Sequence, residues 1–281
     1  MPGSPATLST FTAHDGENLV VQDWPVAEGV RQRGVVLVVH GLGEHAGRYD
    51  AFAQQLNGWG FAVRGYDQYG HGESNGPRGG LTSGTRLVDD LADIVDSTRN
   101  KLAGRWPLVV LGHSMGGLVA AAFARAHPSQ LDGLVLSSPA FATHATPVQR
   151  MLLRTLPRLT PNLRVGNGLD TRWLSHDPAV EIAYRADPLV HDRISARLGQ
   201  FINDGGAGII AAAPDWAVPT LLVYAGDDRL VDPAGSRAFA AAAPSAMVTS
   251  CCLADAYHEI FNEADARPAF DALHCWLDER F

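Results

Sequence analysis

A serine at the centre of a Gly-x-Ser-x-Gly pentapeptide is the residue in this sequence that is best placed for nucleophilic chemistry. The pentapeptide, GHSMG at 112–116, follows an apolar run at 107–111 and precedes a run of small residues that reaches Ala126. This pattern predicts a tight turn from a buried strand into a helix. Glycines on both sides of Ser114 remove side chains that would clash in such a turn, which would lift the hydroxyl above the end of the sheet. We interpret Ser114 as a nucleophile, the alternative being an incidental serine in a glycine-rich turn.

A serine hydroxyl attacks a carbonyl carbon only when a base takes its proton, and the base needs an acid that fixes its orientation. In sheets with this type of turn, the acid and the histidine follow the serine along the chain. That order leaves His258 and His274 as candidates for the base. His274 falls within a predicted helix, whereas His258 lies in a loop after a predicted strand. We therefore predict that His258 is the base.

Three aspartates, Asp227, Asp228 and Asp232, follow the predicted strand at 220–225 and are candidates for the acid. Asp232 precedes Pro233, which suits a helix N-cap because proline is favoured at the first helical position. Asp227 could instead brace the turn. Position favours Asp228 over Asp227 and leaves both open.

Two backbone N–H groups are candidates for an oxyanion hole, which stabilises the negative oxygen that forms during attack on an ester. The N–H of Met115 lies at the start of the helix that follows the serine. The segment HGLGEH at 40–45 follows a predicted strand at 34–39, and its glycines would let the Leu42 N–H approach a substrate. The alternative for this segment is a glycine turn that binds nothing.

Strands that alternate with helices predict an α/β fold with a mostly parallel, doubly wound sheet. A loosely alternating stretch at 7–23 predicts an opening hairpin at one edge of this sheet. Residues 140–213 break the alternation, since they contain short helical patterns and no convincing strand. We predict that they form a helical cap over the strand ends, inserted after a central strand. The expected division is a core at 1–139, a cap at 140–213 and the rest of the core at 214–281.

The composition excludes several classes of protein. The 281 residues carry a net charge of −8 without a basic stripe, which argues against a nucleic-acid partner. The first seven residues lack the basic start and the apolar stretch of a signal peptide, and no run is long enough to span a membrane. The three cysteines lack metal-ligand spacing, so we expect reduced thiols, a cytoplasmic location, and neither a metal nor a cofactor.

Five segments together resemble the monoacylglycerol lipases of the α/β-hydrolase fold, a group that includes lysophospholipases. The segments are HGLGEHAGRY at 40–49, GHGES at 70–74, GHSMGG at 112–117, DRL with Asp232 at 228–232, and YHE at 257–259. They occur in the family's order over nearly the whole chain. The resemblance implies that Ser114 is the nucleophile, Asp228 the acid and His258 the base, with Leu42 and Met115 as oxyanion donors.

The same resemblance places the family's glycerol-binding side chains at Glu44, Arg48 and Tyr184. One position departs from the mammalian members, which carry a further histidine three residues after the base. This chain has Phe261 there. The resemblance therefore supports the reaction type better than the head-group selectivity.

Residues 146–156 predict a cap helix with Val148, Met151 and Leu152 on one apolar face. This face could dip into a lipid surface or pack on the protein's own core. The combined sequence features predict a serine hydrolase that cleaves monoacylglycerols through an acyl-enzyme, with transient membrane contact through the cap. A general carboxylesterase or a lysophospholipase is the alternative, and a non-catalytic binding protein of this fold is more distant.

Overall fold

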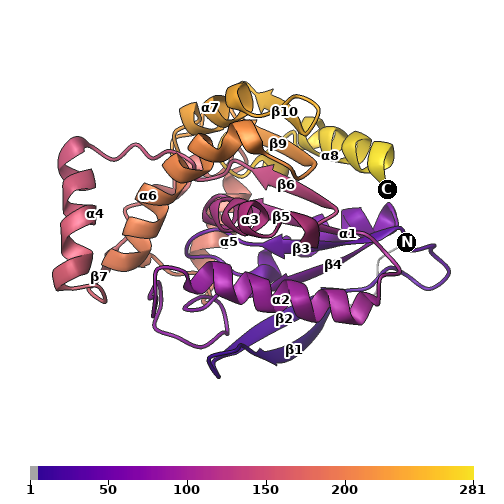
Figure 1. Ribbon diagram of the computed structural model, residues 1–281, viewed down its shortest axis with the longest axis horizontal. Coiled ribbons are helices and arrows are strands. Elements are labelled where there is room, and N and C mark those ends of the chain that lie inside the picture. The colour runs from indigo at the N-terminus through magenta and orange to yellow at the C-terminus, as the bar shows by residue number, and fades with distance from the viewer. Residues whose placement is uncertain (1–5) are drawn as a thin grey trace.

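An eight-stranded sheet forms the centre of the molecule (Figure 1). The computed structural model describes residues 6–281, and its strands follow the order β1-β2-β4-β3-β5-β6-β9-β10. The pairs β1–β2 and β2–β4 are antiparallel, and all other neighbours are parallel. The mostly parallel sheet and its opening edge hairpin are thus as the sequence predicts. The strands are β1 (Thr7–Thr12), β2 (Asn18–Trp24), β3 (Gly34–Val39), β4 (Phe61–Tyr66), β5 (Leu108–His113), β6 (Gly133–Ser137), β9 (Thr220–Ala225) and β10 (Val248–Leu253).

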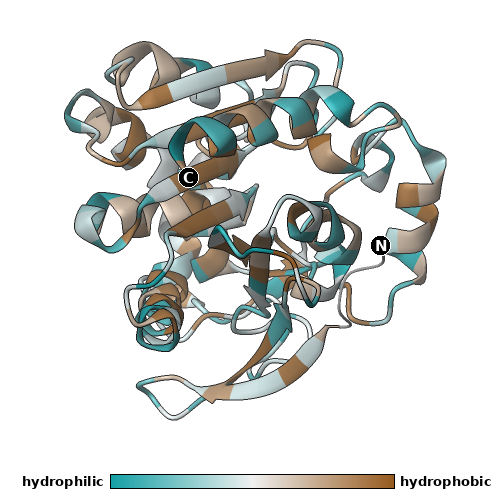
Figure 2. Ribbon diagram, turned by 90° about the vertical axis from the view of Figure 1, so that its right-hand side faces the viewer, coloured by the Kyte–Doolittle hydropathy of each residue, from teal (hydrophilic) through white to brown (hydrophobic). Residues whose placement is uncertain are grey.

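Helices cover both faces of the sheet because its central strands are apolar on both sides. Alternate residues of β3 belong to two separate core clusters, with Leu37 in one and Val36 in the other. Figure 2 shows hydrophobic colour concentrated in the strands and hydrophilic colour on the outer sides of the surrounding helices. One face is covered by α2 (Arg86–Leu102), α3 (Met115–Ala126) and α7 (Ala234–Ala242), and the other by α1 (Asp50–Gly58) and α8 (Arg267–Arg280).

Residues 140–213, which we call the insert, lie between β6 and β9. Figure 1 shows α4 standing away from the sheet, with α6 between it and α3, and α6 packs against both. The prediction that this stretch holds no strand is wrong, because β7 pairs with β8 in an antiparallel ladder. Each of these strands has three residues, too few for an alternating pattern to be visible in the sequence. The insert contains α4 (Pro147–Leu159), β7 (Arg164–Gly166), η3 (Thr171–Trp173), α5 (Pro178–Ala186), β8 (Arg193–Ser195) and α6 (Ala196–Ala212).

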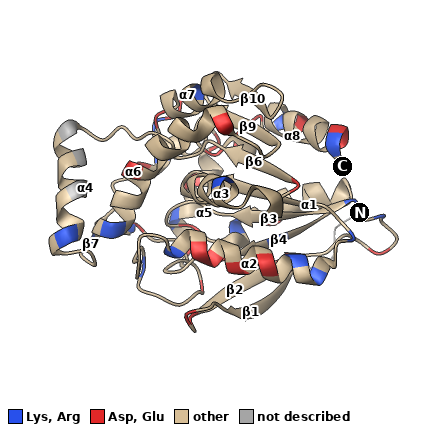
Figure 3. Cartoon of the chain, in the orientation of Figure 1, with Lys and Arg blue, Asp and Glu red and all other residues tan. Residues whose placement is uncertain are grey.

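Short 3-10 helices complete the connections between these elements. They are η1 (Ala46–Tyr49), η2 (Pro128–Gln130), η4 (Ala213–Asp215) and η5 (Ile260–Asn262). In the view of Figure 3, acidic residues line α2, and lysines and arginines are scattered over several elements. Among the described residues, no helix combines the length and the apolarity that a membrane span requires.

The turn from β5 into α3 brings the backbone of Ser114 into the left-handed region, with φ of 55° and ψ of −120°. Such a conformation is costly for a residue that has a side chain. The neighbouring glycines are required by close packing. A Cβ atom at Gly112 would lie 2.4 Å from the Gly116 carbonyl oxygen, and one at Gly116 would lie 2.1 Å from the Val39 carbonyl oxygen. The tight turn predicted from the sequence is therefore present, with β3 pressed directly against it.

We expect Gly116→Ala to destabilise the fold, because its methyl group meets backbone that cannot rotate away. Overpacking of this kind costs roughly 1–3 kcal/mol. Gly58→Ala is the matched control, since a Cβ there contacts nothing within 4 Å, and helix propensity favours alanine by about 0.5–1 kcal/mol. Urea unfolding of the two variants checks this, and a Gly116→Ala variant as stable as Gly58→Ala would contradict it.

Candidate active site

His258 and Asp228 form a buried hydrogen-bonded pair. The His258 Nδ1 atom lies 2.7 Å from Asp228 Oδ2, and the two side chains are 5% and 1% exposed. The other oxygen of Asp228 accepts hydrogen bonds from the backbone N–H groups of Leu230 and Val231, at 2.9 and 3.0 Å. These bonds fix the carboxylate, and the carboxylate in turn fixes the ring, which leaves Nε2 as the nitrogen available to a substrate-side group.

Electrostatics favour the protonated form of this imidazole. Burial by itself lowers the pKa of His258, but the negative charge of Asp228 and the hydrogen bond to it outweigh burial and raise this pKa above its ordinary value. Burial likewise opposes ionisation of Asp228, yet the charge of His258 and the hydrogen bonds that the carboxylate accepts lower the pKa of Asp228. An imidazole in this setting is well suited to hold a proton taken from a serine.

The other candidates from the sequence lie elsewhere. Asp227 pairs with Arg229 at 2.7 Å near the surface. The carboxylate of Asp232 accepts a hydrogen bond from the Ala234 N–H at the start of α7, which is the capping role expected for it. His274 stacks on Trp59 at 4.3 Å on the outside of α8. None of these three polar side chains contacts His258.

One cavity of about 590 Å³ brings together the predicted nucleophile, the base and both predicted oxyanion donors, since Ser114, His258, Leu42 and Met115 all line it. Most of the remaining wall comes from the insert. Within the part of the chain that the structure describes, the N–H groups of Leu42 and Met115 donate no hydrogen bond. The cavity therefore offers a hydroxyl, an imidazole and free backbone donors to one bound molecule.

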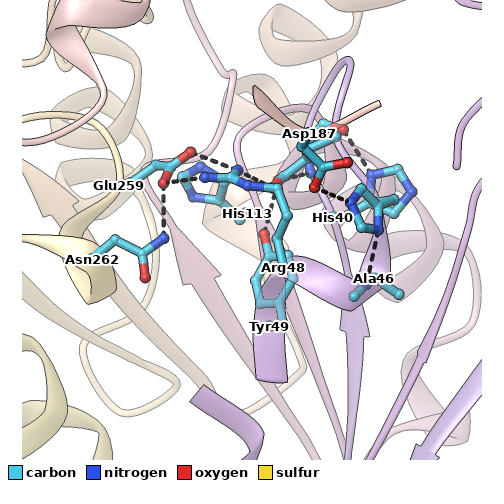
Figure 4. Close-up of polar contacts among 12 residues, drawn as sticks. His40, Ala46, Arg48, Tyr49, His113, Asp187, Glu259 and Asn262 are labelled. Atoms are coloured by element: carbon cyan, nitrogen blue, oxygen red, sulfur yellow. Dashed lines mark hydrogen bonds and ion pairs between the residues drawn. The ribbon is translucent and has the colours of Figure 1, made fainter. Parts of the chain in front are cut away.

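Glu44 and Arg48 lie next to this cavity but do not line it. Their side chains are 4% and 12% exposed and pair at 2.5 Å, and Arg48 also makes a two-point ion pair with Glu259 at 2.8 and 2.9 Å (Figure 4). Burial opposes ionisation of Glu44, but the charge of Arg48 lowers its pKa to about 2. Glu44 also accepts hydrogen bonds from the Tyr49 hydroxyl at 2.9 Å and the Gly41 N–H at 2.5 Å. The charges of Glu44 and Arg48 are therefore already paired within the protein.

Tyr184 comes from α5 and joins this group through its ring, because the Arg48 guanidinium lies over that ring at 4.7 Å. Its hydroxyl makes no hydrogen bond to the residues that the structure describes. The structure thus brings the predicted head-group residues Glu44, Arg48 and Tyr184 together, yet none of the three lines the cavity of Ser114. Their contact with a head group stays a prediction, and among their polar groups the Tyr184 hydroxyl is best able to make it.

The sequence assigned no role to Glu259 or to His113, which both lie in this region. Glu259 is the second carboxylate on Arg48, and Asn262 donates to it at 2.8 Å (Figure 4). His113 packs on the His258 ring at 4.7 Å, and burial together with the charge of His258 lowers its pKa to about 4. The only sequence signal was their position beside His258 and Ser114. Phe261, which departs from the mammalian pattern, packs against Phe52 at 5.0 Å.

We expect Asp228→Asn to lower kcat by roughly 10⁴-fold, because the amide favours the wrong tautomer of the histidine. Asp227→Asn is the matched control one residue away, and it should lower kcat by less than threefold because it breaks only an exposed ion pair. Steady-state hydrolysis of a soluble ester by both variants checks this. A larger loss in Asp227→Asn would show that the acid is assigned to the wrong aspartate.

Comparisons with known proteins agree with this geometry. The chain is 34% identical to a monoacylglycerol lipase of Mycolicibacterium smegmatis, with 99% of each chain covered. It resembles the crystal structure of Paleococcus ferrophilus monoacylglycerol lipase with a TM-score of 0.84 and 35% identity, over 94% of this chain and 99% of that one. It also resembles a soluble variant of the monoglyceride lipase of Saccharomyces cerevisiae, solved with a substrate analogue, with a TM-score of 0.89 and 26% identity over 100% and 96% of the two chains.

The family model described as "Serine aminopeptidase, S33" matches residues 30–265. That range includes Ser114, Asp228 and His258, both predicted oxyanion donors and the predicted head-group residues. The chain therefore belongs to this family of serine hydrolases and has its α/β-hydrolase fold.

Proposed function

We propose that this protein hydrolyses monoacylglycerols to glycerol and a fatty acid through an acyl-enzyme on Ser114. His258 takes the hydroxyl proton as the Ser114 oxygen attacks the ester carbonyl carbon, and the Leu42 and Met115 N–H groups stabilise the oxyanion. The C–O bond to glycerol then breaks, and the leaving oxygen receives the proton from His258. Water, activated by the same histidine, attacks the acyl-enzyme and releases the fatty acid.

One observation carries this proposal. The Asp228–His258 pair opens onto the cavity that also contains Ser114 and two free N–H groups, which are the parts that ester hydrolysis needs. The substrate class is supported by two relatives that match over nearly the full chain, because both are monoacylglycerol lipases. A general carboxylesterase or a lysophospholipase would use the same residues and would differ only in its preference for the alcohol.

The insert is proposed to act as the cap of this site, with the core at 1–139 and 214–281. Of nine large hydrophobic side chains exposed in the described chain, seven lie in the insert. Val148 and Met151 on α4 are 63% and 60% exposed, so these two side chains of its apolar face do not pack on the protein's own core. We infer that α4 contacts lipid surfaces transiently. Free cysteines suit a reducing cytoplasm.

The central test is Ser114→Ala. We expect it to abolish release of fatty acid from a monoacylglycerol and to prevent labelling by a fluorophosphonate, while the thermal transition stays within a few degrees of the wild type. The reason is that the Ser114 hydroxyl lines the same cavity as His258, whose ring is fixed by Asp228. Turnover within tenfold of the wild type, or labelling of the variant, would place the nucleophile elsewhere.

A second prediction concerns the head group. If the Tyr184 hydroxyl contacts glycerol, kcat/KM should be higher for a monoacylglycerol than for the methyl ester of the same acid, by up to about tenfold for one hydrogen bond. Tyr184→Phe should remove most of that preference and leave the methyl ester unaffected. Glu44→Ala is unsuitable for this comparison, because it also releases the Gly41 N–H. A wild type without any preference would indicate a general esterase.

A third prediction concerns lipid contact. Met151→Glu should weaken binding to zwitterionic vesicles and leave hydrolysis of a soluble short-chain ester unchanged, because Met151 is exposed and does not line the cavity. Leu8→Glu adds the same charge at an equally exposed site on β1, far from α4 (Figure 1), and should leave vesicle binding intact. Co-sedimentation with vesicles measures both, and equal binding by the two variants would contradict lipid contact through α4.

A further inference from the structure

The loop that carries the Leu42 N–H is held from both sides by histidines. On one side, the His40 ring nitrogen Nδ1 lies 2.8 Å from the Gly41 carbonyl oxygen. The other ring nitrogen, Nε2, accepts a hydrogen bond from the Gln68 N–H at 3.0 Å, so the proton of the neutral ring is on Nδ1. The Gly41 carbonyl and the Leu42 N–H belong to one planar peptide group. Fixing the carbonyl therefore fixes the direction of the N–H.

On the other side, the loop is held by the insert. The backbone N–H of His191 donates to the Gly43 carbonyl oxygen at 2.9 Å. Gly43 has a φ of 80°, and a Cβ atom there would lie 2.4 Å from the His191 carbonyl oxygen. The insert thus lies directly on the residue that follows Leu42, with no room for a side chain between them.

The His191 side chain fixes this backbone in place. Its Nδ1 accepts from the Arg193 N–H at 3.1 Å, so Nε2 carries the proton and donates to the Gly70 carbonyl oxygen at 3.1 Å. The ring also packs on His71 at 4.8 Å, and His71 packs on His40 at 5.2 Å. A continuous row of three imidazole rings, tilted against one another, therefore joins the two sides of the loop.

We propose that His191 is a positioning residue, through which docking of the insert sets the oxyanion hole. This inference rests on the proposed function, since it assumes that the Leu42 N–H stabilises the oxyanion. Other contacts also hold the insert on the core. His45 lies 2.8 Å from Asp187, and the Ser195 N–H donates to the Gly79 carbonyl oxygen at 2.8 Å. Among the hydrogen bonds of the described residues, the one from the His191 N–H to the Gly43 carbonyl binds the residue next to Leu42, whereas His45 lies three residues from Leu42. The insert is thus a part of the catalytic machinery as well as a cover for the substrate.

The test uses p-nitrophenyl butyrate, a soluble ester that needs no lipid surface, and a trifluoromethyl ketone whose adduct with serine places an oxyanion in the hole. His191→Ala should lower kcat by ten- to a hundredfold, less than the loss of a whole donor, with KM within threefold. Its affinity for the ketone should fall by the same factor as kcat/KM. His191→Phe keeps the packing on His71 but cannot donate to Gly70, so it should show the same losses. This variant tests the role of His191 even if the alanine variant does not fold.

His191→Gln provides the rescue, because its amide reaches the position of Nε2 and can donate to Gly70, so kcat should stay within threefold of the wild type. His127→Ala is the control, because it removes an exposed histidine that lies outside the insert. It should change neither kcat nor the affinity for the ketone. The inference is overturned if the phenylalanine variant keeps kcat within twofold, if its affinity for the ketone is unchanged, or if glutamine is as impaired as phenylalanine. Turnover of Ser114→Ala within tenfold of the wild type would instead overturn the proposed function on which this inference rests.

Discussion

The left-handed backbone of Ser114 is the constraint on which the rest of the structure depends. A residue with a side chain adopts this conformation only when its surroundings enforce it, at a cost of about 1–3 kcal/mol. Here the Ser114 N–H donates to the Ser137 carbonyl at 2.9 Å, and its carbonyl accepts from the Ala140 N–H at 3.0 Å. Gly116 lies against β3. Three adjacent parallel strands, β3, β5 and β6, therefore cooperate to hold one serine above the sheet.

A second constraint is the buried group of Glu44, Arg48 and Glu259. Two carboxylates share one guanidinium, so removing Arg48 would leave two buried carboxylates without their ion-pair partner, which costs several kcal/mol. Glu44 follows the oxyanion loop and Glu259 follows the predicted base, and their common partner Arg48 ties these two loops together. The ion pairs thus fix the distance between two parts of the site that are far apart in the sequence.

The sequence allowed the fold and most of the site to be predicted because their signals are local. Gly-x-Ser-x-Gly between a strand and a helix predicts the turn at Ser114, and chain order selects His258. Family resemblance chose Asp228 over Asp227, and the hydrogen bond to His258 agrees with that choice. What could not be predicted depends on distant contacts. Arg48 and Glu259 are 211 positions apart, and nothing in either segment indicates the other. The exposure of the apolar face of α4 could not be predicted either, because an amphipathic pattern does not show whether another element covers the apolar face.

The buried histidines have a consequence for the stability of the fold in acid. His40, His71, His113 and His191 all have a pKa below the ordinary value, chiefly because burial disfavours the charged ring. A group with a lowered pKa in the folded state binds its proton more readily after unfolding. Each of these rings therefore stabilises the fold above pH 6.5, and that contribution is lost as the pH falls toward about 4, the pKa of His113 and His191. His258 acts in the opposite sense, since its raised pKa stabilises the fold below pH 6.5. The four rings with a lowered pKa therefore reduce the free energy of unfolding as the pH falls from 6.5 toward 4.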